Sequence, residues 1–277
     1  MLQRLWQDYR EKHRRCQRRC PHDSVHDLRV ATRRLLAHLD LLCLLISHES
    51  LDKARSILKQ HLESFAELRD TQVQLSRVTQ QLRVLPELRP LHAALEKFER
   101  RAIKVAADSL AKQHNGKLRQ HMTVATSRLA ATVAEPGADR WQSLAIRQAM
   151  LGRLDQVSQR QKNAAAAPEG IHRTRVAMKK YRYLIEALRP ILSRFPPSRF
   201  QKLVHFQDVT GEIHDIDVMF ARLGTMVKKD KLDAWRTHRF RETLMRQQHA
   251  LLGTYHKLAA ELFTENARTL RFTLQGA

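Results

Sequence analysis

The sequence has 277 residues, which is long enough for one large domain or two small ones with a sizeable buried core. Fifty lysines and arginines against 28 aspartates and glutamates give a net charge of +22, yet 43% of the residues are apolar, so the chain is a folded basic protein rather than a disordered polycation. With only 8 glycines and 8 prolines, the composition favours long helices over sheets, and the charge indicates an acidic partner.

Apolar residues recur at helical spacing along the chain. Leu2, Leu5 and Tyr9 predict a first helix over 1–20, and the stripe that begins at Val25 predicts a second over 25–46. Residues 91–132 are consistent with one long helix or with a pair kinked at residues 115–116, and no segment alternates as a strand does. The other expected helices are 51–65, 69–84, 140–167, 171–189, 198–210, 214–228 and 231–272, the last with a bend near Gly253. The sequence therefore predicts an all-α fold.

An internal repeat is the most informative feature of the sequence. Residues 25–35 align without a gap on residues 171–181, at an offset of 146 residues. Residues 69–73 then align on residues 214–218, at an offset of 145 residues. Two ordered matches at nearly the same offset predict a duplicated helical unit whose copies are related by a pseudo-two-fold axis. The two copies would span residues 1–134 and 140–277.

Each copy carries a basic stripe. His26, Arg29 and Arg33 lie at i, i+3 and i+7 of the predicted helix, so they share one side of it. Like charges at this spacing repel by a few tenths of a kcal/mol per pair unless an anion meets them, and Arg and Lys suit phosphate oxygens. A solvated surface is the alternative interpretation, but a free surface has little reason to keep its register through a duplication. The matching stripe in the second copy is His172, Arg175, Lys179 and Arg182.

The segments HDLRVATRRLLAHL and HRTRVAMKKYRYLIE resemble the two signature helices of the CHAD domain, the conserved histidine α-helical domain. The resemblance extends over essentially the whole chain. It implies two four-helix bundles about a pseudo-two-fold, with a basic central channel that binds inorganic polyphosphate.

The resemblance also implies which residues contact phosphate. Leu36 stands where the first signature helix normally carries an arginine, and Ala66 and Gln72 stand where glycine and aspartate are usual in a later segment. These departures leave open whether the two halves contact the ligand equally. The implied contacts are His26, Arg29, Arg33, Arg34, His172, Arg175, Lys179, Lys180 and Arg182, with Arg69 and His214 as additional candidates.

A zinc site is a possible alternative near the N-terminus. Cys16 and Cys20 are followed by His22 and His26, each pair at i, i+4 spacing. A zinc finger normally has a longer loop between its ligand pairs, so free thiols are the better interpretation. The sequence predicts no metal site.

Four carboxylates stand at corresponding places in the two copies. Asp40 and Glu186 end the basic stripes, while Asp70 and Asp215 begin the next motif. They could be catalytic, but holding neighbouring Arg or Lys side chains in position explains them more simply. The sequence has no P-loop, dinucleotide turn, nucleophile elbow or His-Glu-x-x-His motif. We therefore expect no catalytic residues and no cofactor.

Three functions follow from these observations. The leading hypothesis is a cytoplasmic, non-catalytic polyphosphate-binding protein, associated with polyphosphate granules or polyphosphate-handling enzymes. The second is a nucleic-acid-binding protein, although few aromatic residues and no base-reading module make nucleic acid a non-specific partner. The third is a polyphosphate enzyme with Asp70 or Asp215 as metal ligands. No membrane partner is expected, because the longest apolar run, residues 41–46, is far below the ~20 residues that cross a bilayer, and the N-terminus lacks the apolar region of a secretory signal.

Overall fold

The computed structural model is almost entirely helical in the residues that it describes. It describes residues 1–18, 22–112, 115–134, 136, 138–164, 168–192, 195–229 and 232–263, apart from the side chains of residues 18, 22, 23, 133, 138, 139 and 168. These residues form α-helices and two short 3₁₀ helices, and they contain no β-strand. The prediction of an all-α fold is confirmed.

Ten α-helices follow one another within the described residues. Residues 91–132 form a pair, as one of the two interpretations predicted. The 3₁₀ turns are η1 (Pro86–Leu88) and η2 (Arg189–Ile191). The helices are α1 (Leu2–Arg18), α2 (His22–Leu45), α3 (Glu49–Ser64), α4 (Ala66–Gln81), α5 (Arg89–Lys112), α6 (Asn115–Val133), α7 (Ala138–Ala164), α8 (Pro168–Leu188), α9 (Pro197–Lys228) and α10 (Ala234–Phe263).

The predicted break between 198–210 and 214–228 is wrong, because α9 is continuous through Gly211. Val209, Ile213 and Ile216 are all buried, so the apolar face continues across the glycine. A glycine inside a helix costs about 1 kcal/mol, less than the burial of one large apolar side chain contributes. Helix α10 likewise passes through Gly253, and the predicted residues 264–272 lie outside the described part of the chain.

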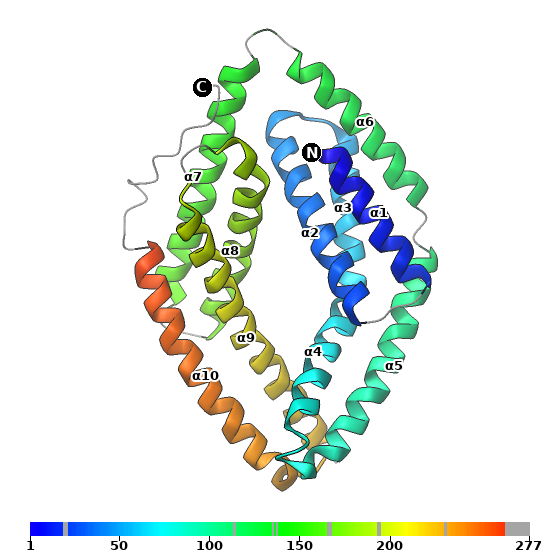
Figure 1. The fold of residues 1–277 in the computed structure, drawn as a ribbon, viewed down its shortest axis with the longest axis vertical. Coiled ribbons are helices and arrows are strands. Elements are labelled where there is room, and N and C mark those ends of the chain that lie inside the picture. The colour runs from blue at the N-terminus through cyan, green and yellow to red at the C-terminus, as the bar shows by residue number, and fades with distance from the viewer. Residues whose placement is uncertain are drawn as a thin grey trace.

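The helices form two groups that lie beside each other (Figure 1). Helices α1 to α6 make one group, and α7 to α10 make the other. Helices α2 and α8 lie on the inner sides of the groups and contact each other, and α4 meets α9 near the lower end. The segments that carry the repeated basic motif therefore lie side by side in the middle of the molecule.

Three buried apolar clusters hold this arrangement together. The first is built mainly from α1, α2, α3 and α6, and it includes the fully buried Tyr9. The second is built from α7, α8, the first half of α9 and the end of α10, around Phe206. The third joins Leu88 and Leu91 to Leu223 and so contains residues from both groups. The predicted duplication, its pseudo-two-fold axis and the division after residue 134 stay predictions.

Helix α2 takes part in both groups. Its residues Leu28, Leu35 and Leu39 are buried in the first cluster, whereas Leu41 and Leu45 pack against the second. The basic stripe lies one residue, about 100°, around the helix from the apolar stripe that begins at Val25. Burial of the apolar stripes therefore sets the basic stripe of α2 close to α8.

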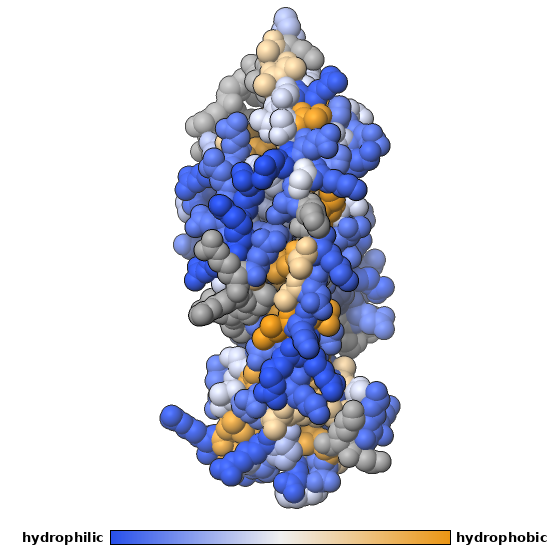
Figure 2. Space-filling model, turned by 90° about the vertical axis from the view of Figure 1, so that its right-hand side faces the viewer, coloured by the Kyte–Doolittle hydropathy of each residue, from blue (hydrophilic) through white to orange (hydrophobic). Residues whose placement is uncertain are grey.

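The outer face formed by α1, α5 and α6 is mostly hydrophilic, with small apolar patches between the helices (Figure 2). None of the described helices combines the length and the hydropathy needed to cross a bilayer.

The third cluster leads to a stability prediction. Leu223→Ala removes a fully buried side chain from the cluster that joins the two groups, so we expect the free energy of unfolding to fall by about 2–5 kcal/mol. Val105→Ala is the control, because Val105 is 63% exposed and its loss should change stability by less than about 0.5 kcal/mol. Urea denaturation measures both. Equal values for the two variants would contradict the role of the third cluster.

Candidate anion-binding site

The basic stripes of α2 and α8 meet at Lys179. Burial and the positive charges of Arg33, Arg175, Arg29 and Arg182 lower the pKa of this amine to about 6. Every charged neighbour that acts on it is an arginine, from α2 or from α8 itself. At neutral pH the amine is therefore mostly uncharged, although a free lysine has a pKa near 10.4.

Arg29 and Arg175 belong to the same cluster of cations. The guanidinium of Arg29 donates to the carbonyl of Leu62 at 2.7 Å, which fixes the side chain against α3. Burial and the charge of Arg33 lower its pKa to about 10. Burial also lowers the pKa of Arg175, although Asp215 opposes this shift. Both guanidiniums are therefore held in places where their charge is only partly compensated.

Asp70 and Asp215 lie at this end of the cluster. Burial raises the pKa of Asp70, opposed most strongly by Arg29 and Arg175. Burial also raises the pKa of Asp215, and the charge of Asp70 adds to this effect, so the two carboxylates lie near each other. Their arginine neighbours fit the expected role of carboxylates that position cations.

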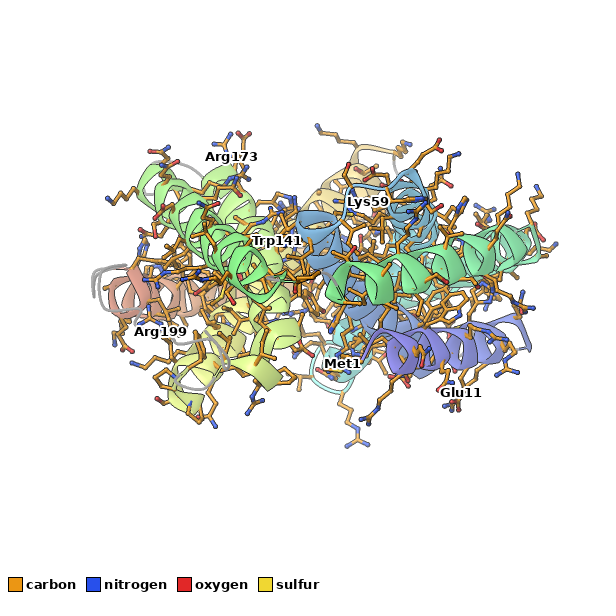
Figure 3. All side chains as sticks on the ribbon, turned by 90° about the horizontal axis from the view of Figure 1, so that it is seen from above. Met1, Glu11, Lys59, Trp141, Arg173 and Arg199 are labelled. Carbon is orange, nitrogen blue, oxygen red and sulfur yellow. The ribbon has the colours of Figure 1, made fainter. Side chains whose placement is uncertain are left out.

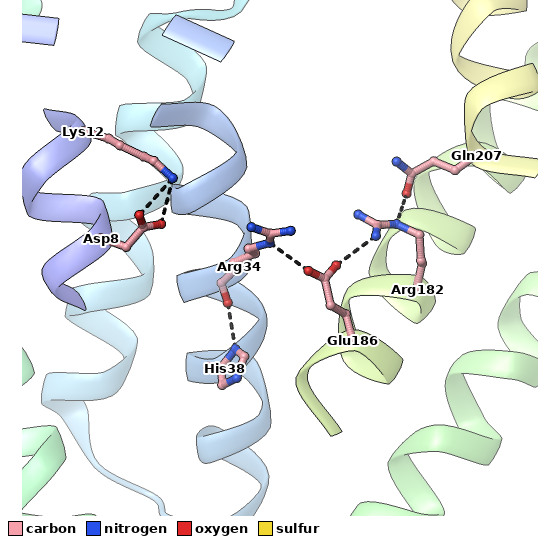
Figure 4. Close-up of polar contacts among 7 residues, drawn as sticks. All are labelled: Asp8, Lys12, Arg34, His38, Arg182, Glu186 and Gln207. Atoms are coloured by element: carbon pink, nitrogen blue, oxygen red, sulfur yellow. Dashed lines mark hydrogen bonds and ion pairs between the residues drawn. The ribbon is translucent and has the colours of Figure 1, made fainter. Parts of the chain in front are cut away.

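A second polar network connects three helices (Figure 4). Arg34 donates through Nε to Glu186 Oε1 at 2.7 Å, and Arg182 donates through Nη1 to Glu186 Oε2 at 2.8 Å. Arg182 also donates through Nε to Gln207 Oε1 at 2.6 Å. Glu186 thus holds two arginines of the motif, as expected for a positioning carboxylate. Asp40 pairs with Arg55 of α3, whose Nη2 lies 2.6 Å from Asp40 Oδ1.

The two histidines of the stripes are exposed at the start of their helices. The ring of His172 lies against that of His214, with centroids 4.9 Å apart. Burial and the charge of Arg175 lower the pKa of His214 to about 4, so this residue is neutral at pH 7. Arg173, next to His172, lies at the outer edge of the molecule (Figure 3).

A cleft of about 450 Å³ opens beside the cations, between α2, α3, α7 and α8. Among the predicted residues, Arg33, Lys179 and Lys180 line it. Arg34 instead lines a separate cavity of about 330 Å³, with Lys12 and Glu186. The predicted residues therefore do not all meet in one place. Arg33, Lys179 and Lys180 line the cleft, whereas Arg34 lines a different cavity.

The sequence matches the model of a known protein family over most of its length. The model of the CHAD domain matches residues 2–224. The chain belongs to the CHAD domain family. The crystal structure of the CHAD domain from the plant Ricinus communis is similar to it with a TM-score of 0.74 at 20% sequence identity, over 99% of this chain and 92% of that one.

PptA from Streptomyces chartreusis is also similar in fold. Its structure has a TM-score of 0.64 at 16% sequence identity, over 93% of this chain and 95% of that one. No curated protein matches the sequence. At these identities, the solved structures show the fold that this CHAD domain shares with them, and no more.

Sequence reasoning missed two cations of the cleft, Lys59 and Arg153. They belong to α3 and α7, in segments that the internal repeat does not include, so no motif marks them. Seen from above, Lys59 lies near the junction of the two helix groups (Figure 3). Arg69 lines a different cavity, between α4, α9 and α10.

The alternative zinc site is described only in part. The buried Cys16 donates through Sγ to the carbonyl of Ser24 at 3.1 Å. Cys20 and the side chain of His22 lie outside the described residues. Among the side chains that the structure does describe, no three of the His, Cys, Asp or Glu type gather as a metal site requires.

The charge state of Lys179 is directly measurable. We expect NMR of the lysine side chains to show Lys179 titrating near pH 6, and we expect Arg33→Gln to raise its pKa, because the variant removes a positive charge beside the amine. Arg128→Gln, which removes an exposed charge on α6, is the control and should leave the titration unchanged. Titration of Lys179 above pH 9 would contradict this account of the site.

Proposed function

We propose that this CHAD domain binds inorganic polyphosphate, without chemical conversion, along the cations between α2 and α8. The observation that supports the proposal best is Lys179, a half-buried amine whose pKa is lowered by burial and by the charges of four arginines. Like charges brought together in a partly desolvated place are unfavourable until an anion joins them. A ligand with many negative charges relieves this repulsion.

The order of the cations favours an extended anion over a single phosphate. Arg29 and Arg33 are one turn apart on α2, about 6 Å along the axis, and Arg175 and Lys179 repeat this spacing on α8. Lys59 and Arg153 add positive charge along the adjoining cleft. A linear chain of phosphates can contact several of these groups in succession, which a single phosphate ion cannot do.

Binding on these residues is electrostatic. Guanidinium groups donate paired hydrogen bonds to phosphate oxygens, and Lys179 takes up a proton as the arriving anion raises its pKa. Glu186 holds Arg34 and Arg182 in position before the anion arrives, while Asp70 and Asp215 compensate part of the charge of Arg29 and Arg175. Each contact releases counterions from the polyanion, so affinity falls as salt rises. No bond in the ligand is broken.

The proposed ligand also indicates where in the cell the protein would act. A protein with this site would be found in the cytoplasm, on polyphosphate granules or beside polyphosphate-handling enzymes. Nucleic acid remains a competing ligand because the net charge of +22 attracts any polyanion. The distinction lies in where the anion binds: between α2 and α8, or across the basic surface.

Competition and matched variants test the proposal. At ~0.15 M salt, we expect long-chain polyphosphate to displace a labelled polyphosphate at concentrations at which DNA of equal charge does not. Arg175→Gln should weaken binding about 10–100-fold, since it removes a charge-assisted contact, whereas Arg128→Gln on the outer helix α6 should change it less than about 2-fold. The label reports the competition, and isothermal titration calorimetry measures the affinities of the two variants.

Two results would overturn the proposal. Equal displacement by DNA and polyphosphate would mean that the protein recognises charge and not this ligand. Equal losses in Arg175→Gln and Arg128→Gln would mean that the cations between α2 and α8 have no special part in binding.

A further inference from the structure

The cleft beside Lys179 has an apolar wall that inorganic polyphosphate does not use. Seven apolar side chains line it together with the cations: Leu36, Ala37, Leu44, Leu62, Ala149, Val176 and Leu184. Leu36 corresponds to Arg182 in the internal repeat, so one turn of α2 carries hydrocarbon where the second copy carries charge. Leu44 is 46% exposed at the same cleft, so part of its side chain is available for contact with a ligand in the cleft.

Cationic and apolar residues are separated along the cleft. Arg33, Leu36, Asp40 and Leu44 follow one another on α2, and the rise of the helix places the first and the last about 16 Å apart along the axis. Helix α8 runs in the same direction as α2 (Figure 1) and repeats the order, with Lys179 before Leu184. Arg33 and Lys179 therefore lie toward one end of the cleft, and Leu44 and Leu184 lie toward the other, on the same side as Asp40.

The other charged groups in the lining do not oppose an anion. Lys59, Arg153 and Lys180 are positive. Asp40 is the carboxylate of the lining, and Arg55 neutralises it through contacts of 2.6 and 2.7 Å to Oδ1. A negatively charged group at the cationic end meets attraction, and a hydrocarbon chain at the other end meets a largely apolar wall.

We propose that this cleft binds a single-chain amphiphilic anion, with its charged head group at Arg33 and Lys179 and its hydrocarbon chain along Leu36, Leu44 and Leu184. A volume of about 450 Å³ is in the range of small-molecule sites. The ligand class differs from inorganic polyphosphate, because its affinity comes partly from the burial of hydrocarbon. The two ligands share cations, and each is tested by its own binding measurement.

Alkyl phosphates of increasing length are the probes. Calorimetry with orthophosphate and with butyl, octyl and dodecyl phosphate, each below its micelle concentration, should show affinity rising about 2–4-fold per added methylene until the chain reaches Leu44. Dodecyl phosphate that binds no more tightly than butyl phosphate would overturn the proposal.

Two exposed leucines give a matched pair of variants. Leu44 lines the cleft, whereas Leu144 on α7 is 58% exposed and is not part of the lining. Leu44→Gln should lower the affinity for dodecyl phosphate by about 5-fold or more and change the affinity for tripolyphosphate by less than about 2-fold. Leu144→Gln should change neither affinity. Equal effects of the two variants on dodecyl phosphate would place the chain outside the cleft and overturn the proposal.

Leu36→Arg distinguishes the two ligand classes, because it should change their affinities in opposite directions. It gives α2 the residue that Arg182 supplies in the second copy, so dodecyl phosphate should bind more weakly and tripolyphosphate more tightly. Because Leu36 is only 8% exposed, Leu44→Gln keeps the test decisive if the charge is not tolerated there. Failure of the wild-type protein to bind tripolyphosphate would contradict the proposed polyphosphate function, while the alkyl phosphate series would still decide this inference.

Discussion

Repulsion among cations between α2 and α8 is the constraint on which the account of this protein depends. Two unit charges 4 Å apart repel by about 1 kcal/mol in water, and by about 4 kcal/mol at the effective dielectric constant found near protein surfaces. The repulsion acts on Lys179, whose pKa burial and the surrounding arginines lower to about 6. The site in the absence of ligand is thus prepared for negative charge and is unfavourable without it.

Apolar packing provides the stability that maintains this repulsion. Leucines of α2 are buried in one cluster and extend into another, and the cluster around Leu88 and Leu223 joins the two helix groups at their lower end. The polar bridge from Arg34 through Glu186 to Arg182 adds a connection between α2 and α8. With the helices fixed in this way, the cations stay close together, and the neutral state of Lys179 and the nearby carboxylates relieve only part of their repulsion.

Periodicity and the internal repeat were sufficient to predict much of this structure. The repeat identified the two helices that meet in the middle, and it included Arg33, Arg175 and Lys179, which the fold brings together. It could not show that Arg34 faces a different cavity, because neighbouring residues on a helix point about 100° apart and only the packing partner decides which one faces the cleft.

Other features depend on tertiary structure and leave no local signal. Lys59 and Arg153 reach the cleft from helices without a motif, and the neutral state of Lys179 arises from residues of two distant segments. The continuity of α9 through Gly211 was missed because a glycine suggests a break, whereas the buried residues on both sides of it determine the helix. Sequence reasoning thus found the charged stripes, and three-dimensional packing determined how they are used.

The most direct test of the account is a crystal structure of the protein with tripolyphosphate. The account predicts phosphate oxygens within about 3.5 Å of nitrogen atoms of both Arg33 and Lys179, between α2 and α8. Phosphate bound only at outward-facing cations such as Arg173, with none between the two helices, would contradict it.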